Sequence, residues 1–265
     1  MSLPTAAAPT EVRLAHCLLD VDGAVLSAER AAEPFYAAST IKLHVLLAVL
    51  RAAEEGGLDL ARTVAATRTF TGADGQTFTL AGDHLDPTHP APGAPVSLRE
   101  LAVRMIDRSS NEATDQLLEL VGLDAVAEVA EELGLAATRI ERRIGDAAAL
   151  AQGLTNETSA ADLARTMHAL ATGTSPWLSE PSRELALGAL RAQRIPIIGA
   201  VAAPGAAWGS KSGWVDGYRH DVAFLGAEGT PPRRVLAVMT AGLEEDEADR
   251  RITALARELM PELTD

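Results

Sequence analysis

The chain has 265 residues and a mass of 27.7 kDa, and 47% of its residues are hydrophobic, which suffices for one large domain or two closely joined ones. The balance of 23 basic and 37 acidic residues gives a net charge of -14, which argues against nucleic acid or an anionic membrane as a partner. No apolar run reaches the roughly 18 residues of a membrane span. The single cysteine, Cys17, excludes an internal disulfide.

The first predicted element is a β-hairpin. Residues 12–21 and 24–29 are rich in Val, Leu and Ala and flank Asp22-Gly23, a dipeptide typical of tight hairpin turns. We expect Cys17 to be a buried strand residue. The residues before the hairpin show neither a basic start followed by an apolar segment nor a lipobox cysteine. No export signal is therefore visible, and we expect either a cytoplasmic protein or an exported one whose signal has been removed.

The next segment places a serine and a lysine at the start of an apolar helix. Ser39-Thr40-Ile41-Lys42 precedes the apolar run 42–57, and side chains three residues apart on a helix have Cβ atoms roughly 5–6 Å apart. A desolvated lysine can accept the serine proton, and free backbone N–H groups at a helix start can stabilise an oxyanion. The alternative is that Ser39 is only a helix cap. His44, further along this helix, is expected to belong to the core or its rim.

A long polar loop and an interrupted helix follow. Residues 69–95 are rich in Gly, Pro, Asp and Thr and are expected to lie on the surface and to border the site. Residues 97–122 then carry a helical pattern that opens with a Ser-x-x-Glu capping box at Ser97. Ser109-Ser110-Asn111 interrupts this pattern, because Ser and Asn favour caps and turns over helix interiors. We expect Ser109 and Asn111 to project from the break.

The last third of the chain is predicted to contain strands and a final helix. Runs at about 195–202, 207–214, 219–227 and 233–241 alternate or are β-branched and end in Gly or Pro. Within the second run, Lys211-Ser212-Gly213 offers a charge, a hydroxyl and a glycine that permits close backbone approach. The acidic start of residues 244–259 is typical of the first turn of an amphipathic helix.

Taken in order, these three segments resemble the signature set of the penicillin-recognising serine enzymes, and most closely that of the class A β-lactamases. That set is Ser-x-x-Lys, then Ser-Asp-Asn, then Lys-Thr-Gly. Here Ser39–Lys42, Ser109–Asn111 and Lys211–Gly213 occupy these places. Residues 17–39 also resemble the family's opening hairpin running into the nucleophile, and residues 110–122 its helix after the second motif.

The resemblance implies how an acyl-enzyme would form. Ser39 would attack the substrate carbonyl, and Lys42 would accept its proton. Ser109 would relay a proton to the leaving nitrogen, while Asn111 would bind a substrate side-chain amide and orient Lys42. Acyl transfer requires a nucleophile, a base, an oxyanion site and a proton donor for the leaving atom, and the resemblance assigns all four.

The resemblance also implies a substrate-binding strand. Lys211 and Ser212 would hold a substrate carboxylate, with Gly213 beside them in the motif. The backbone N–H of Trp214, together with that of the nucleophile, would form the oxyanion hole. His220 lies about where some members of the family place a carboxylate-binding Arg, so we expect it to contact substrate.

One departure concerns deacylation. Class A β-lactamases carry a glutamate in an omega-shaped loop that activates the hydrolytic water, and the position that corresponds to it here is Ile144. The nearest carboxylates are Glu141 and Asp146. Asp146 is the candidate base if the loop is shifted, and the alternative is that it only faces solvent. Without a base, turnover would fall by about 10²- to 10⁴-fold. A smaller departure is Ser110 in place of the usual Asp.

The fold implied by the resemblance is α+β and β-lactamase-like, with an antiparallel sheet flanked by helices and a helical subdomain. We expect a single domain over 1–265, with a sheet half at about 10–39 and 191–265 and a helical half at about 40–190. Five strands would be covered by the first and last helices, with the active site between the halves. The start of the chain looks too short for the N-terminal helix usual in the family.

Three functions remain open. The first is a serine hydrolase of the β-lactamase type that acts on a β-lactam or another amide or ester, an activity associated with antibiotic resistance. The second is a D-alanyl peptidase or esterase on the same fold, and the third a β-lactam-binding protein that acylates without efficient turnover. In each case we expect a monomer, a small-molecule substrate and no cofactor. The six histidines show no paired metal-ligand spacing, so no metal is expected.

Overall fold

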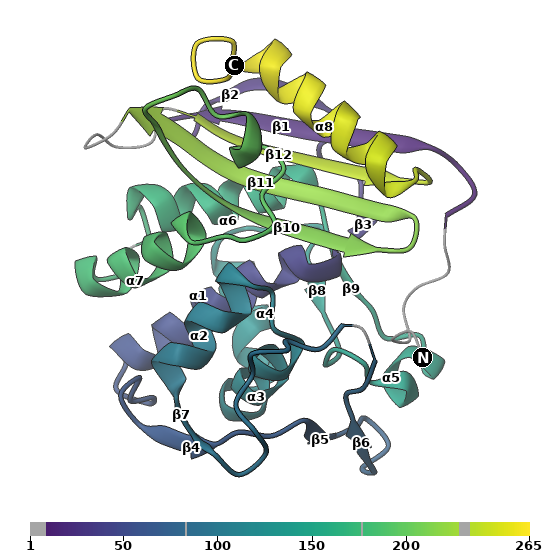
Figure 1. The fold of residues 1–265 in the computed structure, drawn as a ribbon, viewed down its shortest axis with the longest axis vertical. Coiled ribbons are helices and arrows are strands. Elements are labelled where there is room, and N and C mark those ends of the chain that lie inside the picture. Colours follow the sequence, from purple (N-terminus) through teal and green to yellow (C-terminus); the bar gives the residue numbers. More distant parts are fainter. Residues whose placement is uncertain (1–8, 83, 176, 228–233) are drawn as a thin grey trace.

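The computed structural model describes residues 9–82, 84–175, 177–227 and 234–265. Within these ranges the chain forms a sheet half and a helical half, drawn as the upper and lower parts of Figure 1. Strands from both ends of the chain make the sheet, and most of the helices lie between them in sequence. The boundary between the two halves is therefore crossed by the segments that enter and leave the sheet.

A five-stranded antiparallel sheet, in the order β10-β11-β12-β1-β2, confirms the expected architecture. The strands are β1 (Arg13–Asp20), β2 (Val25–Glu29), β10 (Ala206–Val215), β11 (Tyr218–Ala227) and β12 (Arg234–Ala241). The predicted hairpin is the pair β1–β2, and Cys17 is buried within β1, as expected. Because β1 pairs with β12, the N-terminal hairpin and the C-terminal strands share one core.

Different helices cover the two faces of the sheet. The final helix α8 (Glu245–Leu259) packs on β11 and β12 through an apolar cluster that includes Leu236, Ile252 and Met260. On the opposite face, α6 (Ala160–Thr172) packs on β1, β11 and β12, and α7 (Glu180–Arg191) packs on β10. The expectation that the first helix also covers the sheet is wrong for the described chain, since α1 (Lys42–Glu54) lies inside the helical half (Figure 1).

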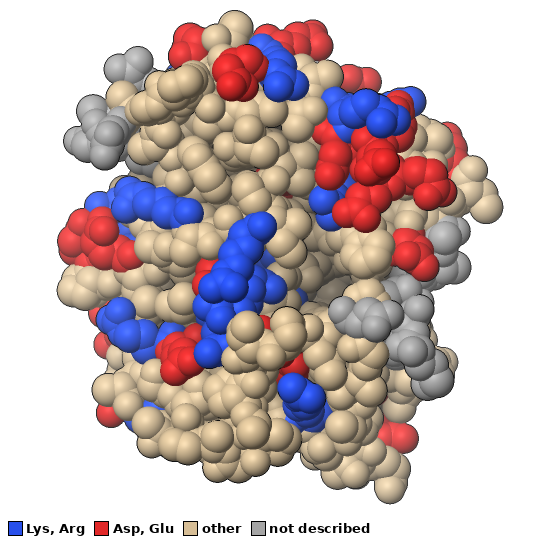
Figure 2. Space-filling view, viewed as in Figure 1, with Lys and Arg blue, Asp and Glu red and all other residues tan. Residues whose placement is uncertain are grey.

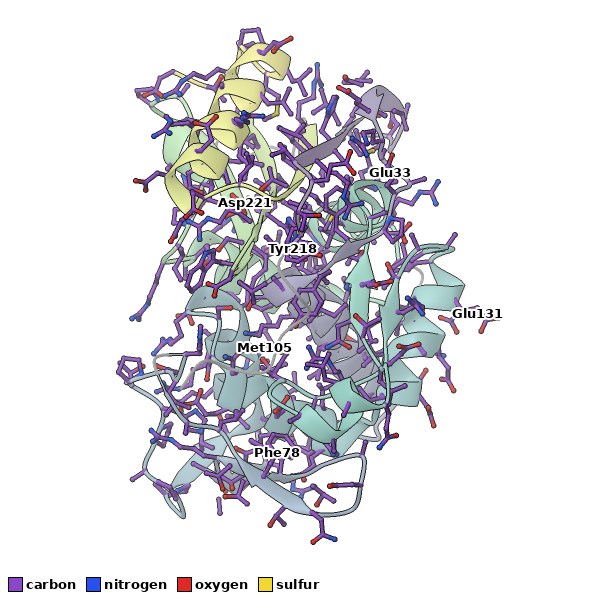
Figure 3. All side chains as sticks on the ribbon, turned by 90° about the vertical axis from the view of Figure 1, so that its right-hand side faces the viewer. Glu33, Phe78, Met105, Glu131, Tyr218 and Asp221 are labelled. Atoms are coloured by element: carbon purple, nitrogen blue, oxygen red, sulfur yellow. The ribbon has the colours of Figure 1, made fainter. Side chains whose placement is uncertain are left out.

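The remaining elements complete the helical half and its connections. They are β3 (Phe35–Tyr36), η1 (Ala38–Ile41), β4 (Thr63–Ala65), β5 (Thr69–Thr71), β6 (Thr77–Thr79), β7 (Pro95–Ser97), α2 (Leu98–Asp107), α3 (Asn111–Val121), α4 (Leu123–Glu132), β8 (Arg139–Ile140), α5 (Ala147–Ala151), β9 (Asn156–Thr158) and η2 (Gly199–Val201). In the side view of Figure 3, Met105 lies within this half and Glu131 points outward from α4. None of the described helices is both long and apolar enough to cross a bilayer.

Local sequence signals explain where these helices begin. Ser97 caps α2 by accepting a hydrogen bond from the backbone N–H of Glu100, as the predicted capping box requires. Ser110 caps α3 through the N–H of Ala113. The predicted interruption of the long helical pattern is therefore confirmed. Ser109 lies in the break with a φ of 58°, a left-handed conformation that serine rarely adopts.

The strand expected at about 195–202 is absent, and residues 199–201 instead form the short turn η2. The cause is the buried carboxylate of Asp221 on β11. Its Oδ2 atom accepts hydrogen bonds from the backbone N–H groups of Ile197 (2.9 Å) and Ile198 (2.8 Å). These N–H groups are thereby satisfied by a side chain instead of a neighbouring strand. Pro196 has no N–H to offer a ladder in any case.

Candidate active site

The nucleophile candidate stands on a tight turn where the two halves meet. Ser39 lies in η1, directly before α1, and Lys42 is the first residue of α1. The Nζ atom of Lys42 lies 3.1 Å from the Oγ atom of Ser39, which is hydrogen-bond distance. The strand β10 passes close to this turn, because a Cβ atom added to Gly213 would lie 3.1 Å from the backbone nitrogen of Ser39. The glycine of the third motif thus permits the close backbone approach that the sequence predicts.

Lys42 is fully buried and surrounded by oxygen atoms. Besides Ser39, it contacts the backbone oxygen of Ser109 (2.7 Å), the Oγ atom of Ser109 (3.0 Å) and the Oδ1 atom of Asn111 (2.7 Å). Burial, with a smaller effect of the nearby charge of Lys211, holds the pKa of the Lys42 ammonium well below its ordinary value. A lowered pKa makes this lysine easier to deprotonate, which suits it to serve as a base for Ser39.

Ser109 connects two lysines. Its Oγ atom lies 3.0 Å from the Nζ atom of Lys42 and 3.1 Å from that of Lys211. The break between α2 and α3 directs this side chain into the site, and Asn111 at the start of α3 also donates to the backbone oxygen of His84 (3.0 Å). The residues that the three motifs predict for the site are therefore brought together, although they are up to 172 positions apart in the sequence (211 minus 39).

Lys211 is also fully buried, but its surroundings differ. Its Nζ atom donates to the backbone oxygen of Ser212 at 2.7 Å. Burial lowers the pKa of the Lys211 ammonium to about 7, opposed by the carboxyl groups of Asp221 and Asp107. Burial likewise raises the pKa of the Asp221 carboxyl to about 7. In Figure 3, Asp221 lies among the strands beside α8.

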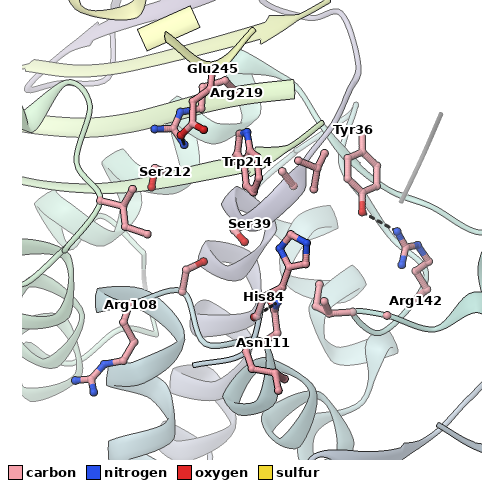
Figure 4. Close-up of a pocket in the computed structure, with 17 residues that line it drawn as sticks. Tyr36, Ser39, His84, Arg108, Asn111, Arg142, Ser212, Trp214, Arg219 and Glu245 are labelled. Atoms are coloured by element: carbon pink, nitrogen blue, oxygen red, sulfur yellow. Dashed lines mark hydrogen bonds and ion pairs between the residues drawn. The ribbon is translucent and has the colours of Figure 1, made fainter. Parts of the chain in front are cut away.

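A cavity of about 350 Å³ lies in front of the nucleophile, and Figure 4 shows its two ends. Ser212 and Arg108 lie to the left of Ser39 in that view, and Tyr36 and Arg142 lie to the right. The described residues that line the cavity come from both halves of the fold. They are Tyr36, Ala38, Ser39, His84, Leu85, Arg108, Ser109, Asn111, Arg142, Ile144, Gly145, Ile195, Ser212, Trp214, Val215, Arg219 and Glu245. The presence of His84 and Leu85 confirms that the long polar loop borders the site.

His220 does not reach the cavity, which corrects the expectation that it contacts substrate. Its side chain is fully buried, its Nε2 atom lies 2.9 Å from the backbone oxygen of Tyr36, and its Nδ1 atom accepts from the N–H of Thr240. Gly213 and His220 are paired across β10 and β11, and so share the face that η1 and β3 cover. Burial lowers the pKa of His220 to about 4, so the imidazole is neutral.

Arg219, which the sequence analysis missed, lines the cavity instead. It is paired with Trp214 across the strands and shares the opposite face of the sheet. Two carboxylates hold its guanidinium, Asp249 at 2.7 Å and Glu245 at 3.0 Å. Strand alternation would have indicated this residue, because neighbours at successive positions point to opposite faces. A one-residue error in the pairing therefore exchanges Arg219 for His220.

Asp146 neither lies in the cavity as a deacylation base nor faces solvent, which were the two expectations for it. It is buried and does not face solvent, and it is absent from the described lining of the cavity. Its Oδ1 atom caps α5 by accepting from the N–H of Ala149 (2.9 Å), and its Oδ2 atom accepts from the N–H of Ala73 (2.9 Å). Both carboxylate oxygens thus bind backbone groups. The geometry assigns Asp146 to holding the loop and gives no support to its role as a base.

Ile144 does line the cavity, as the alignment of the loop predicts for the deacylation position. Its backbone N–H donates to the Oδ1 atom of Asp115 at 2.8 Å, which fixes this part of the loop to α3. Asp115 is fully buried, and burial raises the pKa of its carboxyl well above the ordinary value. Among the described lining residues the single carboxylate is Glu245, which forms an ion pair with Arg219. No described carboxylate therefore stands beside Ile144 in the cavity.

Two further lining residues, Tyr36 from β3 and Arg142 from the loop before α5, carry no signal in the sequence. A lone Tyr or Arg carries no motif, and only the fold brings these two residues to one cavity.

The described part of the chain contains no group of three His, Cys, Asp or Glu side chains that could hold a metal ion. His44 is fully buried in the core, as expected.

A serine beside a buried lysine, set where a helical half meets an antiparallel sheet, is the arrangement of hydrolases that pair serine with lysine. The chain belongs to the β-lactamase enzyme family, whose model matches residues 6–263. No protein with a curated description matches the sequence.

Solved structures agree with this assignment. A β-lactamase from Sphaerobacter thermophilus DSM 20745 is 27% identical with a TM-score of 0.79, and the match covers 96% of this chain and 92% of that one. A β-lactamase from Xanthomonas campestris pv. campestris is 25% identical with a TM-score of 0.77, over 96% and 92% of the two chains. A leucine-to-glutamate mutant of PBP-A, an acyl-enzyme complex with penicillin G, shares the fold at 24% identity and a TM-score of 0.75, over 95% and 91%.

Proposed function

We propose that the protein is a serine hydrolase that forms an acyl-enzyme on Ser39 with a β-lactam. The observation that carries the proposal is the 3.1 Å contact between Ser39 and a buried lysine. Neutral Lys42 takes the Ser39 proton as the Oγ atom bonds to the carbonyl carbon of the substrate. The carbon–nitrogen bond of the β-lactam ring then breaks, and Ser109, which contacts both lysines, returns a proton to the leaving nitrogen.

Two further groups of residues would serve this reaction. The backbone N–H groups of Ser39 and Trp214 would stabilise the oxyanion, because β10 runs directly beside the nucleophile turn. Lys211, Ser212 and Arg219 would hold the carboxylate of the substrate. Ser212 and Arg219 line the cavity, whereas the fully buried Lys211 is not among the described lining residues. Charge-assisted hydrogen bonds from such groups are roughly twice as strong as neutral ones.

The second half of the reaction would be slow. Hydrolysis of the acyl-enzyme requires a base for the attacking water, and such a base typically contributes about 10²- to 10⁴-fold. By the resemblance, Ile144 corresponds to the position where class A β-lactamases carry a glutamate, and no described carboxylate lines the cavity beside it. We therefore propose that the acyl-enzyme accumulates. The same feature favours the two alternatives, a D-alanyl peptidase or esterase and a β-lactam-binding protein.

Intact-mass measurement over time with benzylpenicillin tests the proposal. We expect the mass to rise by that of one penicillin within the first turnover and to return slowly, with a burst in product formation. Ser39→Ala should abolish the adduct while leaving the thermal unfolding temperature nearly unchanged. Labelling of Ser39→Ala at the native rate, or no adduct on the native protein, would refute the acyl-enzyme.

The lifetime of the adduct distinguishes the alternatives. Return of the free protein within seconds indicates a β-lactamase, and an adduct that persists for hours indicates a binding protein. Turnover of a D-alanyl-D-alanine peptide or a simple ester at a higher rate than that of penicillin would identify the peptidase or esterase. We expect a monomer in each of these assays, which the mass under native conditions reports.

A further inference from the structure

Arg142 is a buried charge without a carboxylate partner. Its side chain is among the largest fully buried ones in the described chain, yet the residue lines the cavity. The guanidinium donates to the hydroxyl of Tyr36 at 2.7 Å and to the backbone oxygen of Arg143 at 3.3 Å. No ion pair within 4.0 Å joins it to any described carboxylate. A buried guanidinium costs several kcal/mol of desolvation, so an unpaired one beside a cavity needs a physical reason.

One buried acid, Asp115, lies close to this end of the cavity. Asp115 lies behind Ile144, and its Oδ1 atom binds the backbone N–H of that residue. Burial raises the pKa of the Asp115 carboxyl well above its ordinary value, although the charges of Arg143, Lys42 and Arg142 oppose the shift. The same burial disfavours the ionised carboxyl, and Asp115 forms no ion pair with Arg142 within 4.0 Å. Arg142 therefore has no described carboxylate against it at this end of the cavity.

The hydroxyl of Tyr36 binds the guanidinium of Arg142 and can act as a hydrogen-bond donor in the cavity. Its hydroxyl oxygen accepts from Arg142, so its own hydrogen points elsewhere, and this hydroxyl donates no hydrogen bond to a described residue. Burial raises the pKa of the Tyr36 phenol, so the group keeps its proton and donates. The ring is fixed by Tyr218, at 5.7 Å between ring centroids, and by the guanidinium of Arg142, 5.7 Å from the ring centre.

The Tyr36 hydroxyl lies at the opposite end of the cavity from Ser212, with Ser39 between them. Ser212 and Arg108 occupy one end of the cavity, and Tyr36 and Arg142 occupy the other, with Ser39 between them (Figure 4). A substrate held by its carboxylate at the Ser212 end would extend its acyl side chain toward Tyr36. The face of the molecule drawn in Figure 2 also shows basic side chains at the boundary between the halves, although the net charge is -14.

We propose that Tyr36 and Arg142 form a second anion subsite, which binds a carboxylate on the acyl side chain of the substrate. The inference rests on the proposed function, because it places the substrate across Ser39. The hydroxyl of Tyr36 donates to the carboxylate, and the positive charge of Arg142 behind it selects an anion over a neutral carbonyl. The preferred substrates are thus dianionic, with one carboxylate at each end of the cavity.

Benzylpenicillin and carbenicillin form the matched pair for the test, because they differ by one carboxylate on the acyl side chain. Second-order rate constants for acylation of Ser39 are measured by intact mass for both compounds. In Tyr36→Phe, which retains the ring, the rate for carbenicillin relative to benzylpenicillin should fall by at least about tenfold, the change expected for one lost charge-assisted hydrogen bond. Tyr218→Phe, which alters the neighbouring ring outside the cavity lining, should leave the ratio unchanged.

The possible results separate the two proposals. An unchanged ratio in Tyr36→Phe, or equal losses for both compounds, overturns the second anion subsite and leaves the acyl-enzyme intact. No adduct with either compound on the native protein overturns the proposed function itself. If Tyr36→Phe does not fold, judged by thermal unfolding, Arg142→Gln is measured instead. There too a fall in the ratio supports the subsite, and a constant ratio refutes it.

Discussion

At the scale of single residues, the two buried lysines are suited to different tasks. Lys42 contacts four oxygen atoms within 3.1 Å, and its pKa is held well below the ordinary value by burial and by the charge of Lys211. A base needs such a shift. Lys211, with a pKa lowered by burial to about 7, changes its charge near neutral pH. Binding of a substrate carboxylate should therefore depend on pH.

The pH dependence of Lys211 gives the first residue-scale prediction. Its ammonium is charged below pH 7 and loses its proton above, so the preference for benzylpenicillin over its neutral methyl ester should decline between pH 6 and 8.5. In Lys211→Ala the preference should fall to the part that Ser212 and Arg219 provide, at a cost of about 1.5–3 kcal/mol for the free acid, and should no longer change with pH. The ratio of the two acylation rates cancels the titration of Lys42, which affects both compounds.

Lys211→Arg is the control for this experiment. The guanidinium keeps its charge over the whole pH range, so the ratio of free acid to ester should become independent of pH. A native protein with a flat ratio, or equal losses for both compounds in Lys211→Ala, would show that Lys211 does not bind the carboxylate.

Ile144 gives the second residue-scale prediction. A carboxylate introduced as Ile144→Glu would stand in the cavity at the deacylation position and could activate a water molecule. We expect release of the penicillin adduct to accelerate by about 10²- to 10⁴-fold, with little change in the rate of acylation. Ile144→Gln has the same shape without the base and should release the adduct slowly. Equal release rates for the two variants would mean that the base acts elsewhere.

At the scale of elements, the sequence predicted those parts of the site that carry a motif and a local signal. The Ser-x-x-Lys turn, the break at Ser109 and the glycine of β10 are each dictated by nearby residues, through capping, propensity and close approach. The strand expected at 195–202 failed because a distant side chain, Asp221, binds its N–H groups. Such a tertiary contact leaves no trace in local alternation.

The errors in the site have the same origin. His220 and Arg219 are adjacent in sequence and differ only in the face of β11 to which they point, which depends on the pairing with β10. Asp146 was placed by its spacing from Ile144, but its environment is decided by α5 and by the chain at Ala73. To assign either residue correctly, one must know how segments that are far apart in sequence pair or pack with each other.

The capping of α5 provides a prediction at this scale. Asp146→Ala removes the acceptor for two backbone N–H groups and should lower the free energy of unfolding by about 1–2 kcal/mol, as measured by urea denaturation. Asp146→Asn retains an oxygen acceptor and a good capping residue, so we expect most of the stability to remain. Its adduct lifetime should match that of the native protein. A sharply longer lifetime in Asp146→Asn would restore Asp146 as the base.

At the scale of the whole molecule, both halves depend on neutral buried histidines. His44 lies in α1, and His220 lies in β11, and burial lowers the pKa of each to about 4. Asp221 has the opposite effect, because burial raises its pKa to about 7 and its folded form gains a proton as the pH falls. Over the window from pH 6.5 to 4 the two histidines therefore weaken the fold as the pH falls, whereas the buried carboxyls of Asp221 and Asp115, whose pKa values are raised by burial, act in the opposite direction.

The contribution of His44 to this acid sensitivity can be isolated. An unfolded histidine binds a proton near pH 6.5, whereas folded His44 does so only near pH 4, so its stabilising effect is present above pH 6.5 and is lost as the pH falls through this window. The slope amounts to about 1.4 kcal/mol per pH unit. In His44→Gln, whose amide can still bond Thr166 on α6, urea unfolding between pH 6 and 4.5 should show a slope smaller by that amount. A difference in the absolute free energy of unfolding between the variant and the native protein does not affect this comparison, because proton uptake is measured by the slope against pH alone. Parallel slopes for the native protein and the variant would mean that His44 is protonated in the folded state, contrary to its burial.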